Sequence, residues 1–254
     1  MQATTDMIRL EELTLGYGQR ILLEKVSATF AAGQLTALLG RNGTGKSTLL
    51  RAVSGLETRT REKHRLSMEQ KILLQGIPLA QIPQHQRAAT IAVVTTERVR
   101  ISNLSCKDIV ALGRAPYTNW IGSMQKEDEA IVMQSLEQVG MASYANRSID
   151  TLSDGESQRI MIARALAQTT PIILLDEPTS FLDIPNRYEL CSLLARLAHQ
   201  ENKCILFSTH ELDIATSLCD SIALIDTPNL YHLPAAAMQK SGHLDRLFTR
   251  KPIL

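Results

Sequence analysis

A glycine-rich loop with one lysine stands between an apolar run and a helical pattern. Residues 40–47 read GRNGTGKS, which fits the spacing G-x-x-x-x-G-K-S/T. Glycines let the backbone wrap closely around an anion, so that its N–H groups and the next helix N-terminus stabilise phosphates. Lys46 would bring a positive charge to the terminal phosphates of a nucleotide, and Ser47 would bind Mg²⁺ through its hydroxyl. The residues expected to contact the nucleotide here are Gly40, Arg41, Asn42, Gly43, Thr44, Gly45, Lys46, Ser47 and Thr48.

Two adjacent acids follow a second apolar run. Residues 172–177 read IILLDE, so Asp176 and Glu177 emerge at the C-terminal end of an expected buried strand. Ligands bind at this end of open α/β sheets. We expect Asp176 to bind Mg²⁺ and Glu177 to be the general base that polarises an attacking water. Acids also end strands simply because they are solvated there, so this prediction depends on the glycine-rich loop upstream.

A parallel sheet is the element that would bring these residues together. Apolar runs alternate with helical patterns, as in βαβ units. Leu190, Leu193, Leu194 and Leu197 share one helix face. The sequence therefore predicts an α/β fold, a P-loop NTPase core with a mostly parallel sheet between helices. The expected strands are residues 34–40, 90–96, 171–176, 203–209 and 221–226.

Three segments differ from this core pattern. Residues 8–30 alternate like two antiparallel strands with a turn near residues 16–19. Residues 98–150 are polar and helical, which favours a helical subdomain inserted into a core of residues 1–97 and 151–254 within a single domain. Residues 57–70 are rich in charge, and we interpret them as a solvated surface loop or extension rather than a binding patch.

Composition excludes several classes of protein. The 254 residues carry a net charge of +1, so no basic surface for nucleic acid is expected. The four cysteines are isolated, which is typical of a reduced, cytosolic chain. Neither a signal peptide nor an apolar stretch of ~20 residues is found, so membrane attachment would need a partner.

Residues 152–156 read LSDGE and open a helical pattern. Together with the loop, the DE strand end, the SFLD of residues 180–183 and the strand-end histidine in FSTHELD (residues 207–213), they make the chain resemble the ATP-binding subunits of ABC transporters. The resemblance spans nearly the whole chain. It implies an ATPase whose cofactors are ATP and Mg²⁺ and whose partner is a second copy of itself, head to tail.

The resemblance also implies roles for single residues. Tyr17 would stack on adenine, although it could simply shape a turn. His210 would contact the γ-phosphate, although a lone histidine is often a core residue. Asp183 would lie at the dimer interface, a role compatible with capping a helix. The signature residues expected to close over the ATP of the partner copy are Ser153, Asp154, Gly155 and Glu156.

The chain departs from the family pattern at two positions. The family has a glutamine where this chain has Thr96, so either Thr96 reaches Mg²⁺ through a water, or Glu97 substitutes, or coupling is altered. Asp154 replaces a glycine of the signature, and we expect it to turn outward or to cap the helix. Lys46, Asp176, Glu177 and His210 are retained, so the ATPase is expected to be active.

A finer resemblance concerns the cargo. Residues 109–120 read IVALGRAPYTNW, which is similar to the importers of ferric siderophores, haem or cobalamin. It implies an ATPase at the cytoplasmic face of the plasma (inner) membrane, paired with a permease and indirectly with a substrate-binding protein. Ferric siderophore is the expected cargo, with haem and cobalamin as alternatives. A non-transport ABC ATPase and a regulatory ATP-binding module are the competing classes.

Overall fold

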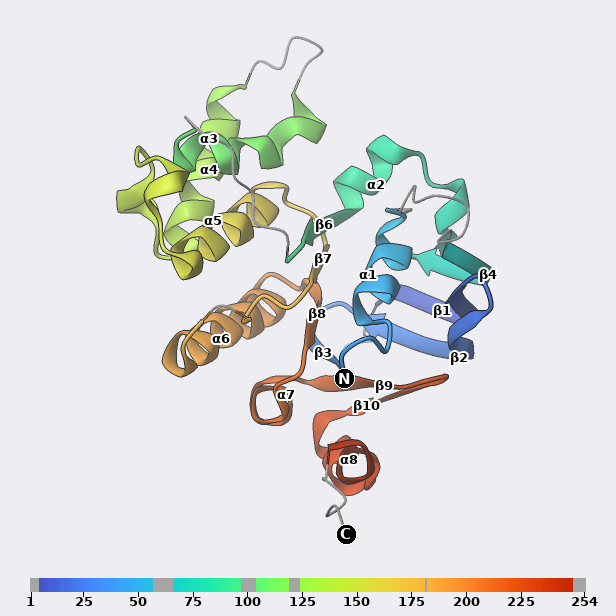
Figure 1. The fold of residues 1–254 in the computed structure, drawn as a ribbon. Helices are drawn as coiled ribbons and strands as arrows, with labels where there is room; N and C mark the ends of the chain where they lie inside the picture. Colours follow the sequence, from blue (N-terminus) through green and yellow to red (C-terminus); the bar gives the residue numbers. More distant parts are fainter. Residues whose placement is uncertain (1–4, 57–65, 97–103, 119–123, 181, 249–254) are drawn as a thin grey trace.

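The computed structural model describes residues 5–56, 66–96, 104–118, 124–180 and 182–248 (Figure 1). A six-stranded sheet lies at its centre, and β10 is antiparallel to β9 while the other neighbours are parallel. The five predicted apolar strands are confirmed; two match the predicted ranges at both ends, and the ends of the other three shift by at most two residues. In sheet order, the strands are β10 (Asn229–Pro234), β9 (Ser221–Asp226), β3 (Gln34–Gly40), β8 (Cys204–Thr209), β7 (Ile172–Leu175) and β6 (Ile91–Val94).

Helices cover both faces of this sheet, and its central strands are therefore buried along their whole length. On β3, Leu35, Ala37 and Leu39 pack towards α5 (Asp154–Ala167) and α6 (Ile184–Gln200), while Leu38 packs towards α1 (Lys46–Ser54) and a second, antiparallel sheet. Successive strand residues face opposite sides, which produces this alternation. The helices are α1 (Lys46–Ser54), α2 (Gln84–Thr90), α3 (Cys106–Ala111), α4 (Lys126–Gln138), α5 (Asp154–Ala167), α6 (Ile184–Gln200), α7 (Leu212–Leu218), α8 (Ala235–Lys240) and α9 (His243–Phe248).

The second sheet is antiparallel, as predicted for residues 8–30. Its order is β2 (Arg20–Ala31), β1 (Asp6–Tyr17), β4 (Leu66–Leu74) and β5 (Ile77–Pro78). The prediction of a loop is wrong for residues 66–70, because they belong to β4 and pair with β1 from Tyr17↔Leu66 onward. On the edge of β1 that faces away from β2, backbone N–H and C=O groups need hydrogen-bond partners. Residues 66–70 supply these partners, and they therefore form a strand in spite of their charged composition. Residues 57–65 lie outside the described chain.

The segment predicted as a helical subdomain contains α3, the 3₁₀ helix η3 (Leu112–Tyr117) and α4, which pack on α5. Arg114 joins these helices, since its Nε lies 2.9 Å from Asp128 Oδ1 and its Nη1 donates to Ala167 O over 2.8 Å. A Cβ on Gly113 would collide with the carbonyl oxygen of Arg164. The LGR-x-PY stretch therefore closes the C-terminal end of α5. The boundaries of the subdomain stay a prediction.

The cysteines of the described chain are free and buried, at positions 106, 191, 204 and 219. Burial raises the pKa of Cys191 and of Cys204 to about 12, so neither is a thiolate nucleophile. Within the described segments, every helix is too short or too polar to cross a bilayer.

His232 on β10 connects the two sheets. Its ring lies 4.8 Å from that of Phe30 on β2, and its Nε2 lies 3.0 Å from Ser221 Oγ. Burial lowers the pKa of His232 because the charged imidazolium loses water there.

We predict that acidification lowers the free energy of unfolding through His232. The unfolded chain, with a histidine pKa of ~6.5, binds a proton that the folded chain excludes, so stability falls as the pH drops through that value. Urea unfolding at about pH 5 and about pH 8 measures the difference. His232→Gln, which stays polar and cannot be protonated, should lose this part of the difference. An unchanged pH dependence in His232→Gln would contradict the prediction.

Candidate active site

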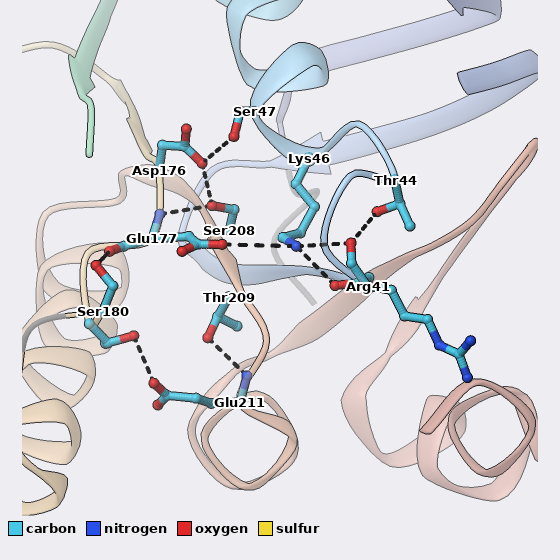
Figure 2. A network of polar contacts seen from close by, with 12 residues as sticks. Arg41, Thr44, Lys46, Ser47, Asp176, Glu177, Ser180, Ser208, Thr209 and Glu211 are labelled. Atoms are coloured by element: carbon cyan, nitrogen blue, oxygen red, sulfur yellow. Dashed lines mark hydrogen bonds and ion pairs between the residues drawn. The ribbon is translucent and has the colours of Figure 1, made fainter. Parts of the chain in front are cut away.

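The glycine-rich loop joins the C-terminal end of β3 to α1. Gly43 and Gly45 have φ angles of 77° and 106°, a region that side chains other than hydrogen rarely allow. Lys46 Nζ donates to the carbonyl oxygens of Gly40 and Arg41, over 2.9 Å and 3.3 Å (Figure 2). These two hydrogen bonds hold the backbone of the loop around the Lys46 ammonium group.

Lys46 is a buried cation, with 5 % of its surface exposed. Desolvation lowers its pKa, and the nearby carboxylates of Glu177 and Asp176 offset part of this effect. The nearer carboxylate, Glu177 Oε1, is 4.0 Å from Lys46 Nζ. An anion in the loop would supply the stabilisation that lost water no longer gives, so this position favours phosphate.

Asp176 connects three segments through a single carboxylate oxygen. Its Oδ1 accepts from Ser47 Oγ over 3.0 Å and from Ser208 Oγ over 2.6 Å. The described residues contain no cluster of three His, Cys, Asp or Glu side chains that could hold a metal. A hydroxyl and a carboxylate nonetheless fit Mg²⁺, which commonly takes one or two protein oxygens together with phosphate oxygens and water.

Glu177 has a strained backbone, with a φ of 46°. Such a conformation costs a residue other than glycine about 1–2 kcal/mol, and it persists where surrounding contacts hold it. The N–H of Glu177 donates to Ser208 Oγ over 2.8 Å, and its carbonyl accepts from Ser180 N and Ser180 Oγ over 3.2 Å and 3.0 Å. These contacts hold the turn from which the Glu177 carboxylate points to Lys46 (Figure 2).

One cavity of about 350 Å³ unites most of the predicted nucleotide and catalytic residues. Its Tyr17 hydroxyl lies 3.3 Å from Thr48 Oγ1, so the ring stands beside the loop. Arg20 and Leu22 also line it, and the sequence reasoning missed both, although Arg20 lies in the same turn as Tyr17. The lining residues are Tyr17, Arg20, Leu22, Asn42, Gly43, Gly45, Lys46, Ser47, Thr48, Glu177 and His210.

Arg41 and Thr96 are among the predicted residues that do not line this cavity. The guanidinium of Arg41 donates from Nε and Nη2 to Leu247 O of α9, over 3.0 Å and 2.6 Å, so Arg41 contributes its carbonyl to the loop and its side chain to α9. Thr96 is exposed in a bend two residues beyond β6 and does not line the cavity. Glu97 lies outside the described residues, so the question of the missing glutamine stays open.

The signature segment begins α5, away from the cavity lining. Ser153 is the N-cap, and Glu156 completes a capping box with it. Hydrogen bonds from the Ser153 N–H and then its hydroxyl lower the pKa of Glu156. Asp154 is exposed in the first turn, where the helix N-terminus favours a carboxylate, and the cap is Ser153 rather than Asp154. Gly155 allows close packing, since a Cβ there would lie 2.8 Å from Leu182 Cδ2.

Asp183 caps α6, as the alternative reading of its role predicted. Its Oδ1 accepts from Asn186 N over 3.1 Å. This contact does not test the expected role of Asp183 at the dimer interface, because a side chain that caps the start of a helix can also face a partner chain.

The loop, the carboxylate pair and the parallel sheet define a P-loop ATPase. A family model described as ABC transporter matches residues 23–180. The chain belongs to the ABC transporter family, as an ATP-binding subunit with ATPase activity.

Known proteins agree with this assignment. The chain is similar to the iron(3+)-hydroxamate import ATP-binding protein of Bacillus subtilis, with 36% identity over 81% of this chain and 73% of that protein. It is also similar to a probable siderophore transport system ATP-binding protein of the same organism, with 35% identity over 88% and 78%. A dimeric bacterial ABC transporter cassette is 26% identical with a TM-score of 0.76, covering 90% of this chain and 99% of that chain.

We predict that Lys46→Ala weakens ATP binding by about 1.5–3 kcal/mol, the contribution of a hydrogen bond to a charged group, which is roughly 10- to 150-fold in Kd. Isothermal titration with ATP measures the change. Lys203→Ala is the matched control, because Lys203 is also a buried lysine and donates to Thr170 O over 3.0 Å outside the cavity. Equal ATP affinity in Lys46→Ala and the native chain would contradict the assignment.

Proposed function

We propose that this chain is the ATP-hydrolysing motor of a metal-chelate importer whose cargo is a ferric siderophore. The observation that carries the proposal is the single cavity in which Lys46, Ser47, Glu177 and His210 meet. A cation and a metal-binding hydroxyl suit the phosphates and their metal, a carboxylate suits the attacking water, and an imidazole adds a hydrogen-bond donor for the transferred phosphoryl group. One relative is named for iron(3+)-hydroxamate import and another for probable siderophore transport, and this supports the choice of cargo.

Each residue of the site has a defined role in the proposed reaction. The N–H groups of residues 43–47 and the Lys46 ammonium hold the β- and γ-phosphates of ATP, and Tyr17 stacks on the base. Ser47 and Asp176 would hold Mg²⁺, which would supply positive charge against the phosphates. Glu177 accepts the proton of the attacking water, and His210 donates a hydrogen bond to the γ-phosphate.

A second copy of the chain would complete the site. The signature residues Ser153 and Gly155 do not line the cavity of their own chain, yet they lie at the N-terminus of α5, where the helix dipole favours an anion. We infer that two chains associate head to tail, so that each signature closes over the ATP of the other. Loss of the γ-phosphate then favours separation.

The permease would dock between the core and the helical subdomain. A cavity of about 660 Å³ lies there, lined by α1, α2, η3 and α5. Leu56 and Leu112 on its two sides are 52% and 50% exposed, which suits an apolar helix of a membrane partner. The chain would thus be a peripheral subunit at the cytoplasmic face of the plasma membrane. Its link to a substrate-binding protein would be indirect, through the permease.

Uptake in a strain that lacks this chain tests the proposal. Labelled ferric siderophore, haem and cobalamin are offered side by side, with the gene restored as native or as Glu177→Gln. Glu177→Gln preserves size and removes the basic carboxylate. We expect only ferric siderophore to enter, and only with the native gene.

Other outcomes separate the parts of the proposal. Uptake of haem or cobalamin alone would keep the motor and replace the cargo. Equal uptake with both genes would contradict the role of Glu177. If no cargo enters with the native gene, the non-transport ATPases become the better class.

A further inference from the structure

Ser208 is a buried hydroxyl between the two acids of the site. It lies on β8 and is 0 % exposed. Its Oγ is 2.6 Å from Asp176 Oδ1 and 2.8 Å from Glu177 N. Figure 2 shows the side chain between these two residues. The sequence gives no pattern that marks it, since it is one serine in an apolar strand.

The directions of these hydrogen bonds follow from the donors present. The backbone N–H of Glu177 can only donate, so Ser208 Oγ accepts from it. The single hydroxyl hydrogen of Ser208 is then free to donate to the Asp176 carboxylate, which can only accept when ionised. Ser47 Oγ donates to the same Asp176 oxygen. A continuous chain of hydrogen bonds therefore runs from the Glu177 backbone through Ser208 and Asp176 to Ser47.

The sheet register accounts for this placement. β7 and β8 are in register up to Leu175↔Phe207, so the next residue of each strand, Asp176 and Ser208, stand opposite one another. Cys204 and Leu206 pack on the side of α1, and strand alternation places Ser208 on the same side. That side carries Ser47.

We propose that Ser208 is a positioning residue that sets the direction of the Glu177 carboxylate and ties it to Asp176. The inference rests on the proposed function, in which Glu177 is the general base. Glu177 has a φ of 46°, and a residue in this region needs contacts that hold it. Ser208 holds the N–H of Glu177 while Ser180 holds its carbonyl. Without the Ser208 hydroxyl, the turn relaxes and the carboxylate loses its aim at the attacking water.

Ser208→Ala tests the inference, with turnover of Mg-ATP, ATP affinity and urea unfolding measured on the full chain. We expect kcat to fall roughly 10- to 100-fold, the loss typical of a residue that hydrogen-bonds a metal-binding side chain such as Asp176, while KM changes little. Ser208→Thr keeps a hydroxyl in a strand-compatible side chain and should recover most of kcat.

Ser221→Ala is the matched control. Ser221 is a buried serine on β9, and its Oγ lies 2.8 Å from Thr36 Oγ1 and 3.0 Å from His232 Nε2. Neither contact involves Glu177. It should lose stability comparably to Ser208→Ala and keep its kcat. Equal kcat in Ser208→Ala and Ser221→Ala would overturn the inference. If urea unfolding shows that Ser208→Thr does not fold, the comparison of kcat between Ser208→Ala and Ser221→Ala decides the inference alone.

Glu177→Gln, assayed in parallel, separates the inference from the function on which it rests. Loss of turnover in Glu177→Gln with native turnover in Ser208→Ala overturns the inference and leaves the proposed base intact. Native turnover in Glu177→Gln overturns both, because Ser208 would then have no base to position.

Discussion

The site depends on one carboxylate oxygen, Asp176 Oδ1, which accepts hydrogen bonds from two hydroxyls that lie far apart in the chain. Ser47 belongs to the start of α1, and Ser208 belongs to β8. Asp176 follows β7, and α1 follows β3. This oxygen therefore joins the ends of three neighbouring strands, β3, β8 and β7. Burial makes the contacts strong and makes any unpaired member expensive. The loop, the metal-binding acid and the general base therefore take up their positions together.

The parallel sheet makes this junction possible. β3, β7 and β8 are neighbours in register, so their C-terminal ends meet at one edge. One sheet face carries α1 and the antiparallel sheet with Tyr17, and the other carries α5 and α6. The phosphate loop is thus on one face and the signature helix on the other. This separation explains why the signature does not line its own chain's cavity, and why we invoke a second copy.

Much of this arrangement could be predicted from the sequence, because continuous apolar runs and the spacing of glycines and lysine reflect strong local constraints. β4 was missed because a charged segment became a strand only through pairing with β1. The side chain of Arg41 donates to a carbonyl of α9, a contact between residues 41 and 247 that no local pattern encodes. Ser208 and Arg20 were missed because a single polar residue has no periodicity. Long-range contacts therefore limit the prediction more than local propensity does.

The most direct test of the account is the Mg²⁺ dependence of ATP affinity in Asp176→Asn, measured by isothermal titration beside the native chain. Asparagine keeps the size of the side chain and removes the charge that attracts the metal. We predict that Mg²⁺ tightens ATP binding to the native chain and changes it little in Asp176→Asn. An equal effect of Mg²⁺ on both proteins would contradict the role of Asp176 as the junction between metal and loop.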